Sequence, residues 1–225
     1  MSVIPLRSEL GWLRGFDPDR RMLVGRTYRI AKRFTDLVIV LAAMPVWLPL
    51  LGIIALAIAL TSPGKSVIFI QERTGKGGRR FHMYKFRTMV PDSESLRPQY
   101  AHLNELKWPD FKITDDPRVT RVGRFLRRTS LDELPQLINI LLGEMSLVGP
   151  RPTSFGSETY KLWQTQRLDV IPGLTGLWQI YGRGLLDFDE RLRMEILYIE
   201  RRCMTLDLLI LLRTFEAVVK QRGAY

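Results

Sequence analysis

Two adjacent carboxylates, Asp132 and Glu133, lie between arginines that precede and follow them, Arg127 and Arg151. A carboxylate can attack phosphorus or hold a divalent cation, and arginines can clamp a migrating phosphate. This mixture of residue types is typical of phosphoryl transfer. The same chain contains a long apolar segment, Leu37–Leu60. A phosphate site beside a membrane anchor predicts a water-soluble phosphate donor and a lipid acceptor.

The local context of the acid pair has two interpretations. Ser130 and Glu133 fit a capping box, in which the acids merely complement a helix dipole. Pro135 opposes that register, because proline is well tolerated only at the first helical position. In the second register a helix spans Pro135–Leu142, Gly143 ends it, and the acids stand outside it facing a ligand. The sequence alone leaves both registers open.

The candidate chemistry assigns different roles to the two acids. Asp132 can attack phosphorus and form an acyl phosphate, and Glu133, with Asp132 as a second ligand, can hold Mg²⁺ or Mn²⁺. Because a carboxylate and a phosphate repel each other, cations must offset the repulsion. Arginine has a fork that matches phosphate oxygens, although any one of the candidates could instead be a solvated surface charge. The candidate phosphate-binding residues are Arg127, Arg151, Lys85, Arg87 and Arg118.

The apolar segment Leu37–Leu60 contains no charged residue. A straight helix of this length would be roughly 36 Å long, enough to cross a bilayer. Pro45 and Pro49 lie near its middle and would bend it, and basic residues crowd both flanks, which favours the cytoplasm for both ends. We therefore favour a re-entrant helix over a single-pass span. Carbonyl groups freed at the bend would need partners from side chains or water, since the segment has no Ser or Thr.

Overall composition supports a membrane-surface protein. The chain has 34 Lys and Arg against 23 Asp and Glu, a formal net charge of +11, and basic residues are attracted to anionic lipid. We find no signature of a nucleic-acid-binding fold. One cysteine excludes an intrachain disulfide, and two histidines give no zinc pattern, so any metal should be a hard cation held by carboxylates. We expect a cytosolic arm at 1–30, a re-entrant membrane helix at 31–63 and a cytosolic catalytic domain at 64–225.

Periodicity predicts an α+β fold that is mostly helical and contains one small β-hairpin. Two further helices, around residues 188–199 and 208–219, carry apolar stripes that either pack in the core or lie in the membrane interface as amphipathic helices. The remaining expected elements are a hairpin from Val67–Gln71 and Phe81–Phe86 around a turn at 74–78, a short helix near Leu96–Leu106, a loop at Met145–Pro152 and a turn at 172–176.

At these residues the chain resembles the bacterial sugar transferases, the monotopic phosphoglycosyl transferase family. The resemblance spans about residues 30–225 and rests on many ordered blocks. The matching blocks are Lys32-Arg33-Phe34-Thr35-Asp36, Gln71-Glu72-Arg73-Thr74-Gly75, Lys85-Phe86-Arg87-Thr88-Met89, Asp116-Pro117-Arg118-Val119-Thr120, Ser130-Leu131-Asp132-Glu133-Leu134-Pro135-Gln136-Leu137, Met145-Ser146-Leu147-Val148-Gly149-Pro150-Arg151-Pro152 and Pro172-Gly173-Leu174-Thr175-Gly176.

The resemblance implies transfer of a sugar-1-phosphate from a nucleotide sugar, usually a UDP-sugar, to polyprenyl (undecaprenyl) phosphate. It implies a ping-pong mechanism with the phosphosugar carried on Asp132, a Mg²⁺-associated Glu133 and a phosphate-binding Arg127. It also implies a proline-broken re-entrant helix, a place at the bacterial inner membrane with the catalytic domain on the cytoplasmic face, and an initiating role in exopolysaccharide, capsule, O-antigen or glycoprotein glycan synthesis. The match is to the family's catalytic core, and we expect no further domain before it.

Two rival functions remain at this stage. A lipid phosphatase or phosphotransferase could use the same acid pair without a nucleotide sugar. A non-enzymatic membrane adaptor would bind anionic lipid in a salt-dependent way and would tolerate substitution of Asp132. The identity of the sugar and whether the chain forms a homo-oligomer are not readable, and Trp178–Gly184 is our candidate segment for sugar or nucleotide contact.

Overall fold

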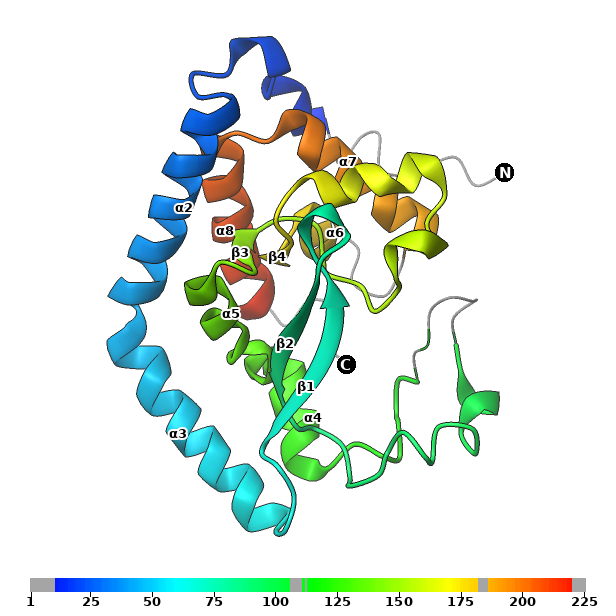
Figure 1. Cartoon of the computed structure of the whole chain (residues 1–225). Helices are drawn as coiled ribbons and strands as arrows, with labels where there is room; N and C mark the ends of the chain where they lie inside the picture. The colour runs from blue at the N-terminus through cyan, green and yellow to red at the C-terminus, as the bar shows by residue number, and fades with distance from the viewer. Residues whose placement is uncertain (1–10, 106–110, 112, 182–185, 220–225) are drawn as a thin grey trace.

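The computed structural model describes residues 11–105, 111, 113–181 and 186–219. Within these ranges the protein is mostly helical with a small antiparallel hairpin, which confirms the α+β prediction (Figure 1). The helices are α2 (Gly25–Ala42), α3 (Met44–Thr61), α4 (Arg121–Thr129), α5 (Gln136–Leu142), α6 (Leu177–Tyr181), α7 (Phe188–Arg201) and α8 (Met204–Val219). The strands are β1 (Ile68–Thr74), β2 (Arg80–Phe86), β3 (Ser146–Val148) and β4 (Gly173–Thr175). Short 3₁₀ turns are η1 (Gly11–Gly15), η2 (Pro18–Arg20), η3 (Lys76–Gly78), η4 (Ala101–Leu103), η5 (Leu131–Glu133), η6 (Ser157–Thr159) and η7 (Leu162–Asp169).

The apolar segment breaks at one place, between α2 and α3. The break lies at Ala43, two residues before Pro45 in the first turn of α3, whereas helix α3 continues through Pro49. The two helices form a bent edge of the molecule (Figure 1). Pro45 is tolerated there because the first turn of a helix has no partner for its N–H groups anyway. The prediction of a break was therefore correct for Pro45 and wrong for Pro49.

A side chain satisfies one of the carbonyl groups freed at this break. The indole Nε1 of Trp47 donates to the carbonyl of Val40 at 2.9 Å, and both residues are buried. The expectation that side chains would serve the freed carbonyls is confirmed at this position. Trp47 therefore holds the bend in one geometry from the first turn of α3.

The hairpin places two sets of side chains on opposite faces. Strands β1 and β2 pair antiparallel, with Arg73 opposite Phe81 and Phe69 opposite Lys85. Directly opposite residues share a face, and so do residues two apart on one strand. Lys85 and Arg73 therefore lie on the same face. On the other face Phe86, 1% exposed, packs in a cluster with residues of α3 and α4.

The acid pair lies in a tight connection between two helices. Helix α4 ends at Ser130, whose φ of 57° is left-handed, and turn η5 follows at once. Helix α5 then begins after Pro135 and ends at Gly143, whose φ is 84°. An N-cap residue needs an extended backbone, so the capping-box interpretation of Ser130 is wrong. The register with both acids outside α5 is confirmed.

Two loop predictions were wrong, because each contains a three-residue strand. Strands β3 and β4 pair in parallel, Ser146 beside Gly173 and Val148 beside Thr175. Strands this short show no alternation in sequence, and their pairing depends on a distant segment. A Cβ at Gly173 would lie 2.0 Å from the nitrogen of Gly149, so the close approach of the two loops requires glycine there.

The helix expected near Leu96–Leu106 was also wrong in the described part. Residues 91–100 form consecutive turns, followed by η4 and then by extended chain up to Glu105. Leu106 lies outside the described residues. Pro91 and Pro98 interrupt this stretch, and each removes a backbone donor that a regular helix would need.

Helices α7 and α8 pack beside α2 through a shared carboxylate. Asp207 of α8 accepts hydrogen bonds from the hydroxyls of Tyr28 (2.8 Å) and Tyr198 (2.6 Å), and its Oδ2 lies 2.9 Å from Lys32 Nζ. The predicted core stripe of α7 is confirmed at Leu192 and Ile199, which are buried. These contacts fasten α2, at the beginning of the apolar segment, to α7 and α8.

The apolar stripe expected at 208–219 lies mainly outside the core, so its core-packing interpretation was wrong and the amphipathic interpretation remains. The buried face of α8 carries Leu206 and Ile210, both 0% exposed, whereas Leu208, Leu212 and Phe215 are exposed. Helix α8 therefore combines a core face with an apolar face that is open to the surroundings, the pattern of a helix lying in a membrane interface.

Candidate active site

Asp132 and Glu133 are presented by the η5 turn against the hairpin. Lys85 Nζ lies 2.6 Å from Asp132 Oδ2 and 3.9 Å from Glu133 Oε1. Asp132 is buried, and its side chain is only 4% exposed. Burial of a carboxylate without a partner is costly, so the Lys85 ammonium stabilises the charged aspartate in this position.

Arg151 binds the second acid. Its two terminal nitrogens, Nη1 at 3.2 Å and Nη2 closer still, contact the two carboxylate oxygens of Glu133 in a forked arrangement. Burial alone would lower the pKa of Arg151, but the charge of Glu133 and these hydrogen bonds raise it above its ordinary value. The backbone nitrogen of Arg151 also donates to Glu195 Oε1 at 2.9 Å. Arg151 is therefore fixed and charged.

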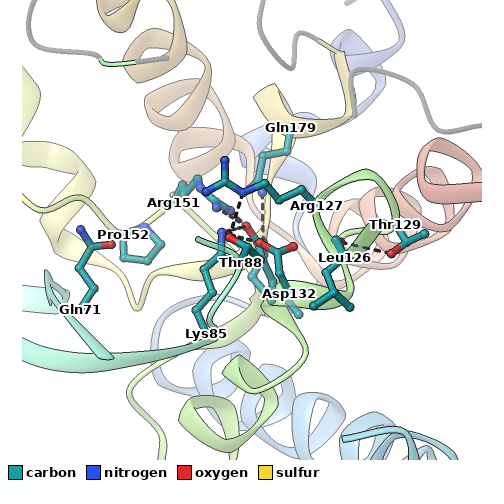
Figure 2. Close-up of polar contacts among 12 residues, drawn as sticks. Gln71, Lys85, Thr88, Leu126, Arg127, Thr129, Asp132, Arg151, Pro152 and Gln179 are labelled. Atoms are coloured by element: carbon teal, nitrogen blue, oxygen red, sulfur yellow. Dashed lines mark hydrogen bonds and ion pairs between the residues drawn. The ribbon is translucent and has the colours of Figure 1, made fainter. Parts of the chain in front are cut away.

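Arg127 reaches the site from α4 and is oriented by a hydroxyl group. Its Nε donates to Thr88 Oγ1 at 3.0 Å. Burial lowers the pKa of Arg127, and the charge of Asp132 opposes that change. Figure 2 shows Lys85, Arg127 and Arg151 converging around Asp132 from three different elements. The sequence-based prediction that these cations would meet at the acid pair is thus matched by the geometry.

The other two predicted phosphate-binding residues point elsewhere. Arg87 donates to the carbonyl of Ser62 at 2.9 Å, at the end of α3. Arg118 is buried and binds Asp116 with both Nε (2.9 Å) and Nη2 (2.6 Å). The structure therefore brings Lys85, Arg127 and Arg151 to the acids. Arg87 lies elsewhere, and the guanidinium group of Arg118 is paired with Asp116.

A cleft of about 600 Å³ opens beside the Arg151–Glu133 pair. Its walls combine arginines with aromatic rings, as expected for a pocket that takes an anionic ligand with a flat ring. Trp178 is one of these aromatic residues, so the beginning of the segment predicted to contact the sugar or nucleotide lies at the cleft. Gly182 to Gly184 lie outside the described residues. The arginine and aromatic lining residues are Arg73, Arg97, Arg118, Arg151, Arg167, Arg191, Phe111, Phe155, Trp178 and Phe188.

Sequence reasoning missed two residues that the structure brings to the site. Thr88 orients Arg127, and Arg73 lines the cleft. Strand alternation could have identified Arg73, because pairing of the two strands puts it on the same face as Lys85. Thr88 carried no such signal, since it lies beyond the end of β2 and meets Arg127 only through tertiary packing.

The two acids fit a magnesium ion that is also bound by substrate. Among the described residues no group of three or more His, Cys, Asp or Glu side chains could enclose a metal. Mg²⁺ commonly binds to one or two carboxylates and completes its shell with phosphate oxygens and water. Adjacent Asp132 and Glu133 supply that donor set, so a metal here would depend on a bound phosphate.

The distribution of exposed apolar residues indicates where a membrane would lie. Helix α3 is long and apolar enough to cross a bilayer, and only 17% of it is buried. Exposed apolar side chains continue from α2 onto α3 and include Phe34, Val38, Leu41, Val46, Leu48, Ile53, Leu56 and Leu60. A continuous apolar surface of this kind is typical of a membrane contact.

Comparison with known proteins gives a consistent result. The profile of the family described as "Bacterial sugar transferase" matches residues 27–221. Undecaprenyl-phosphate galactose phosphotransferase of Salmonella typhimurium is 41% identical over 208 residues, covering 90% of this chain and 43% of its own length. UDP-glucose:undecaprenyl-phosphate glucose-1-phosphate transferase of Xanthomonas campestris is 42% identical over 207 residues, covering 87% and 40%. Exopolysaccharide production protein ExoY of Rhizobium meliloti is 37% identical over 215 residues, covering 93% and 95%. The chain thus spans less than half the length of the first two relatives and nearly all of the third.

Proposed function

Because the chain belongs to the bacterial sugar transferase family, we propose that it moves a sugar-1-phosphate from a UDP-sugar to undecaprenyl (polyprenyl) phosphate. The observation that carries the proposal is the buried Asp132, 2.6 Å from Lys85 and surrounded by Arg127 and Arg151 beside an arginine-lined cleft. The names of two relatives include undecaprenyl phosphate, and one of them also includes a UDP-sugar. This reaction initiates the synthesis of a polysaccharide or glycan on a lipid carrier.

In the first half-reaction a carboxylate oxygen of Asp132 attacks the phosphorus that bears the sugar. A P–O bond forms to Asp132, the P–O bond to UMP breaks, and UMP leaves with the bonding electron pair. One pair of unit charges about 4 Å apart contributes about 4 kcal/mol at an effective dielectric constant of about 20. Repulsion between the aspartate and the donor phosphates is of this size for each phosphate charge, and each of the surrounding cations, Lys85, Arg127 and Arg151, opposes it.

In the second half-reaction an oxygen of polyprenyl phosphate attacks the same phosphorus. The bond to Asp132 breaks, the carboxylate is restored, and polyprenyl-diphosphate-sugar is released. UMP leaves before the lipid phosphate enters, so one cationic site serves both substrates. Lys85 stabilises Asp132 each time its negative charge returns.

A divalent cation, Mg²⁺ or Mn²⁺, is part of this proposal. Glu133 would hold it, with Asp132 as a second ligand, and when bound it neutralises phosphate oxygens and improves the leaving group. Arg151 keeps Glu133 in place through its forked contact, so the acid is held in a single orientation beside Asp132.

The proposed location is the bacterial inner membrane, with the active site on the cytoplasmic side. The bend at Pro45 and the exposed apolar surfaces of α3 and α8 support a re-entrant anchor with α8 in the interface. A lipid phosphate lies at the head-group level, and a re-entrant anchor holds the site at that depth. This geometry gives the soluble donor and the lipid acceptor access to one aspartate.

The test is a search for the covalent intermediate. Purified protein in lipid nanodiscs is incubated with Mg²⁺ and a panel of UDP-sugars, and intact mass and UMP release are measured before undecaprenyl phosphate is added. We expect one UDP-sugar to add a sugar-phosphate mass and release an equal amount of UMP. Asp132→Asn should lose both signals, whereas Asp115→Asn, an exposed neighbour outside the site, should keep both.

The same experiment separates the rival functions. A lipid phosphatase would release inorganic phosphate from undecaprenyl phosphate without any nucleotide sugar. A non-enzymatic adaptor would bind anionic vesicles equally well after Asp132→Asn and release no UMP. Absence of both adduct and UMP with every UDP-sugar would overturn the proposed function.

A further inference from the structure

The cleft beside the acid pair contains arginines of two kinds. Arg118 is neutralised by Asp116, and Arg167 by Glu195 at 2.7 Å; all four side chains are 4% exposed. A buried, paired guanidinium of this kind already has its counter-charge inside the protein. These two arginines therefore form the rigid wall of the cleft and have no charge left to balance.

Arg73, which lines the same cleft, has no acidic ion-pair partner among the described residues. Its Nη1 donates to the carbonyl of Pro152 at 3.4 Å and its Nη2 to the side-chain oxygen of Gln71, and both acceptors are neutral. Its Nε is buried and has no hydrogen-bond partner in the described structure. Arg73 thus carries a charge and a donor that the protein itself does not satisfy.

The electrostatic surroundings of Arg73 are also unfavourable. Burial, together with the positive charges of Arg151 and Arg80, lowers the pKa of Arg73 to about 10, although the charge of Glu133 opposes the change. Because the folded-state pKa lies below the ordinary value, holding Arg73 charged costs stability at every pH below about 10. An anion bound between Arg73 and Arg151 would offset the repulsion between their two guanidinium charges.

We propose that Arg73 binds the nucleotide end of the donor diphosphate and forms, with Arg151, a two-arginine clamp across it. The inference rests on the proposed function. It adds Arg73 as a binding residue and an orientation of the donor diphosphate in the cleft. Arg151 contacts Glu133 and lines the cleft together with Arg73, so it links the acids to the cleft in which Arg73 lies. The phosphate that bears the sugar then faces Asp132, and the phosphate of the departing UMP faces Arg73. Arg73 stabilises the charge that UMP acquires as it leaves.

The alternative is a purely structural role, in which Arg73 only ties β1 to the loop at Pro152. The backbone already makes this connection, because Thr74 N donates to the carbonyl of Thr153 at 2.9 Å. The two roles predict opposite effects on stability. Removing a structural tie would lower the stability of the unliganded protein. Removing a repelled and unsatisfied cation would leave that stability unchanged or raise it.

The test uses Arg73→Gln and Arg73→Lys, with Arg79→Gln as a charge-matched control. Arg79 is an exposed arginine on the same hairpin and does not line the cleft. In nanodiscs we measure thermal unfolding without ligand, equilibrium binding of UDP, and inhibition of adduct formation by UDP, UMP and uridine. We expect Arg73→Gln to unfold at the same temperature as wild type or higher. It should bind UDP and UMP roughly 10- to 100-fold more weakly, the range for a lost hydrogen bond to a charged group, with uridine inhibition unchanged.

Arg73→Lys should be intermediate, because lysine keeps the charge but not the fork. Arg79→Gln should bind UDP within twofold of wild type. The clamp is overturned by any of three results for Arg73→Gln. These are UDP binding equal to wild type, a loss of inhibition by uridine as large as the loss for UDP, or clear destabilisation of the unliganded variant. If wild type forms no adduct, the proposed function fails, yet UDP binding still decides whether the clamp exists.

Discussion

The ammonium group of Lys85 bridges the acid pair, 2.6 Å from Asp132 Oδ2 and 3.9 Å from Glu133 Oε1. Strand pairing puts Lys85 on the face of the hairpin that meets the η5 turn. We expect Lys85→Met to slow adduct formation by about 100-fold or more, the usual size of loss for one preorganised donor. Rapid-quench measurement of UMP release checks this. Lys76→Met, an exposed lysine in the hairpin turn, is the control, and equal rates for both variants would contradict the role of Lys85.

Gly123 allows α4 to approach Thr88, the residue that orients Arg127. A Cβ at Gly123 would lie 2.0 Å from the Thr88 carbonyl oxygen. Gly123→Ala should therefore destabilise the protein by about 2 kcal/mol or more, as overpacking does, and also slow adduct formation through a displaced Arg127. Denaturant unfolding and single-turnover kinetics measure the two effects. Gly52→Ala, with nothing within 4 Å, should leave the kinetics unchanged and should not lower stability, because alanine favours a helix more than glycine does.

Asn139 fastens the hairpin to α5. It is 0% exposed, donates to the His82 carbonyl at 2.7 Å and accepts from Tyr84 N at 3.0 Å. Asn139→Ala leaves both backbone groups unsatisfied, so we expect a loss of about 3 kcal/mol in unfolding free energy. Faster amide exchange at Tyr84 should accompany it. Gln99→Ala, at an exposed site, is the control; similar stability of the two variants would refute the contribution of Asn139.

Removal of the divalent cation should stop the first half-reaction. With excess EDTA we expect neither adduct nor UMP, and both should return when Mg²⁺ is added back. The reason is that the acids hold the metal only together with donor phosphates. Glu133→Gln should require more Mg²⁺ for half-maximal rate. Full activity in EDTA would exclude a metal role in this site.

The bend at Pro45 predicts the membrane topology. Tags on the two termini should be cleaved by protease from the same side of sealed vesicles. Pro45→Leu should increase the fraction with termini on opposite sides, because the break lies next to Pro45. Pro49→Leu is a matched control, since α3 passes through Pro49 without a break. Termini on opposite sides in wild type would rule out the re-entrant anchor.

Much of the site could be predicted locally. The placement of Asp132 and Glu133 outside α5 follows from Pro135, whose missing N–H restricts where the helix can begin. The break near Pro45 follows from the same chemistry, and the hairpin from alternation around a glycine-rich turn. Arg151 could be identified because it follows the acids closely in a stiff proline-rich loop.

Other features depend on contacts between distant segments. The short strands β3 and β4 exist only because Gly149 and Gly173 let two remote loops touch, and Thr88 becomes important only where α4 packs on it. By itself the sequence determined that the two acids stand outside α5 and that the apolar segment breaks near Pro45, since both depend on local backbone chemistry. Only the tertiary structure decided which cations are already paired, as Arg167 is with Glu195, and which, like Arg73, keep an unbalanced charge in the cleft. Residues 167 and 195 are far apart in the sequence, and only folding brings such counter-charges into contact.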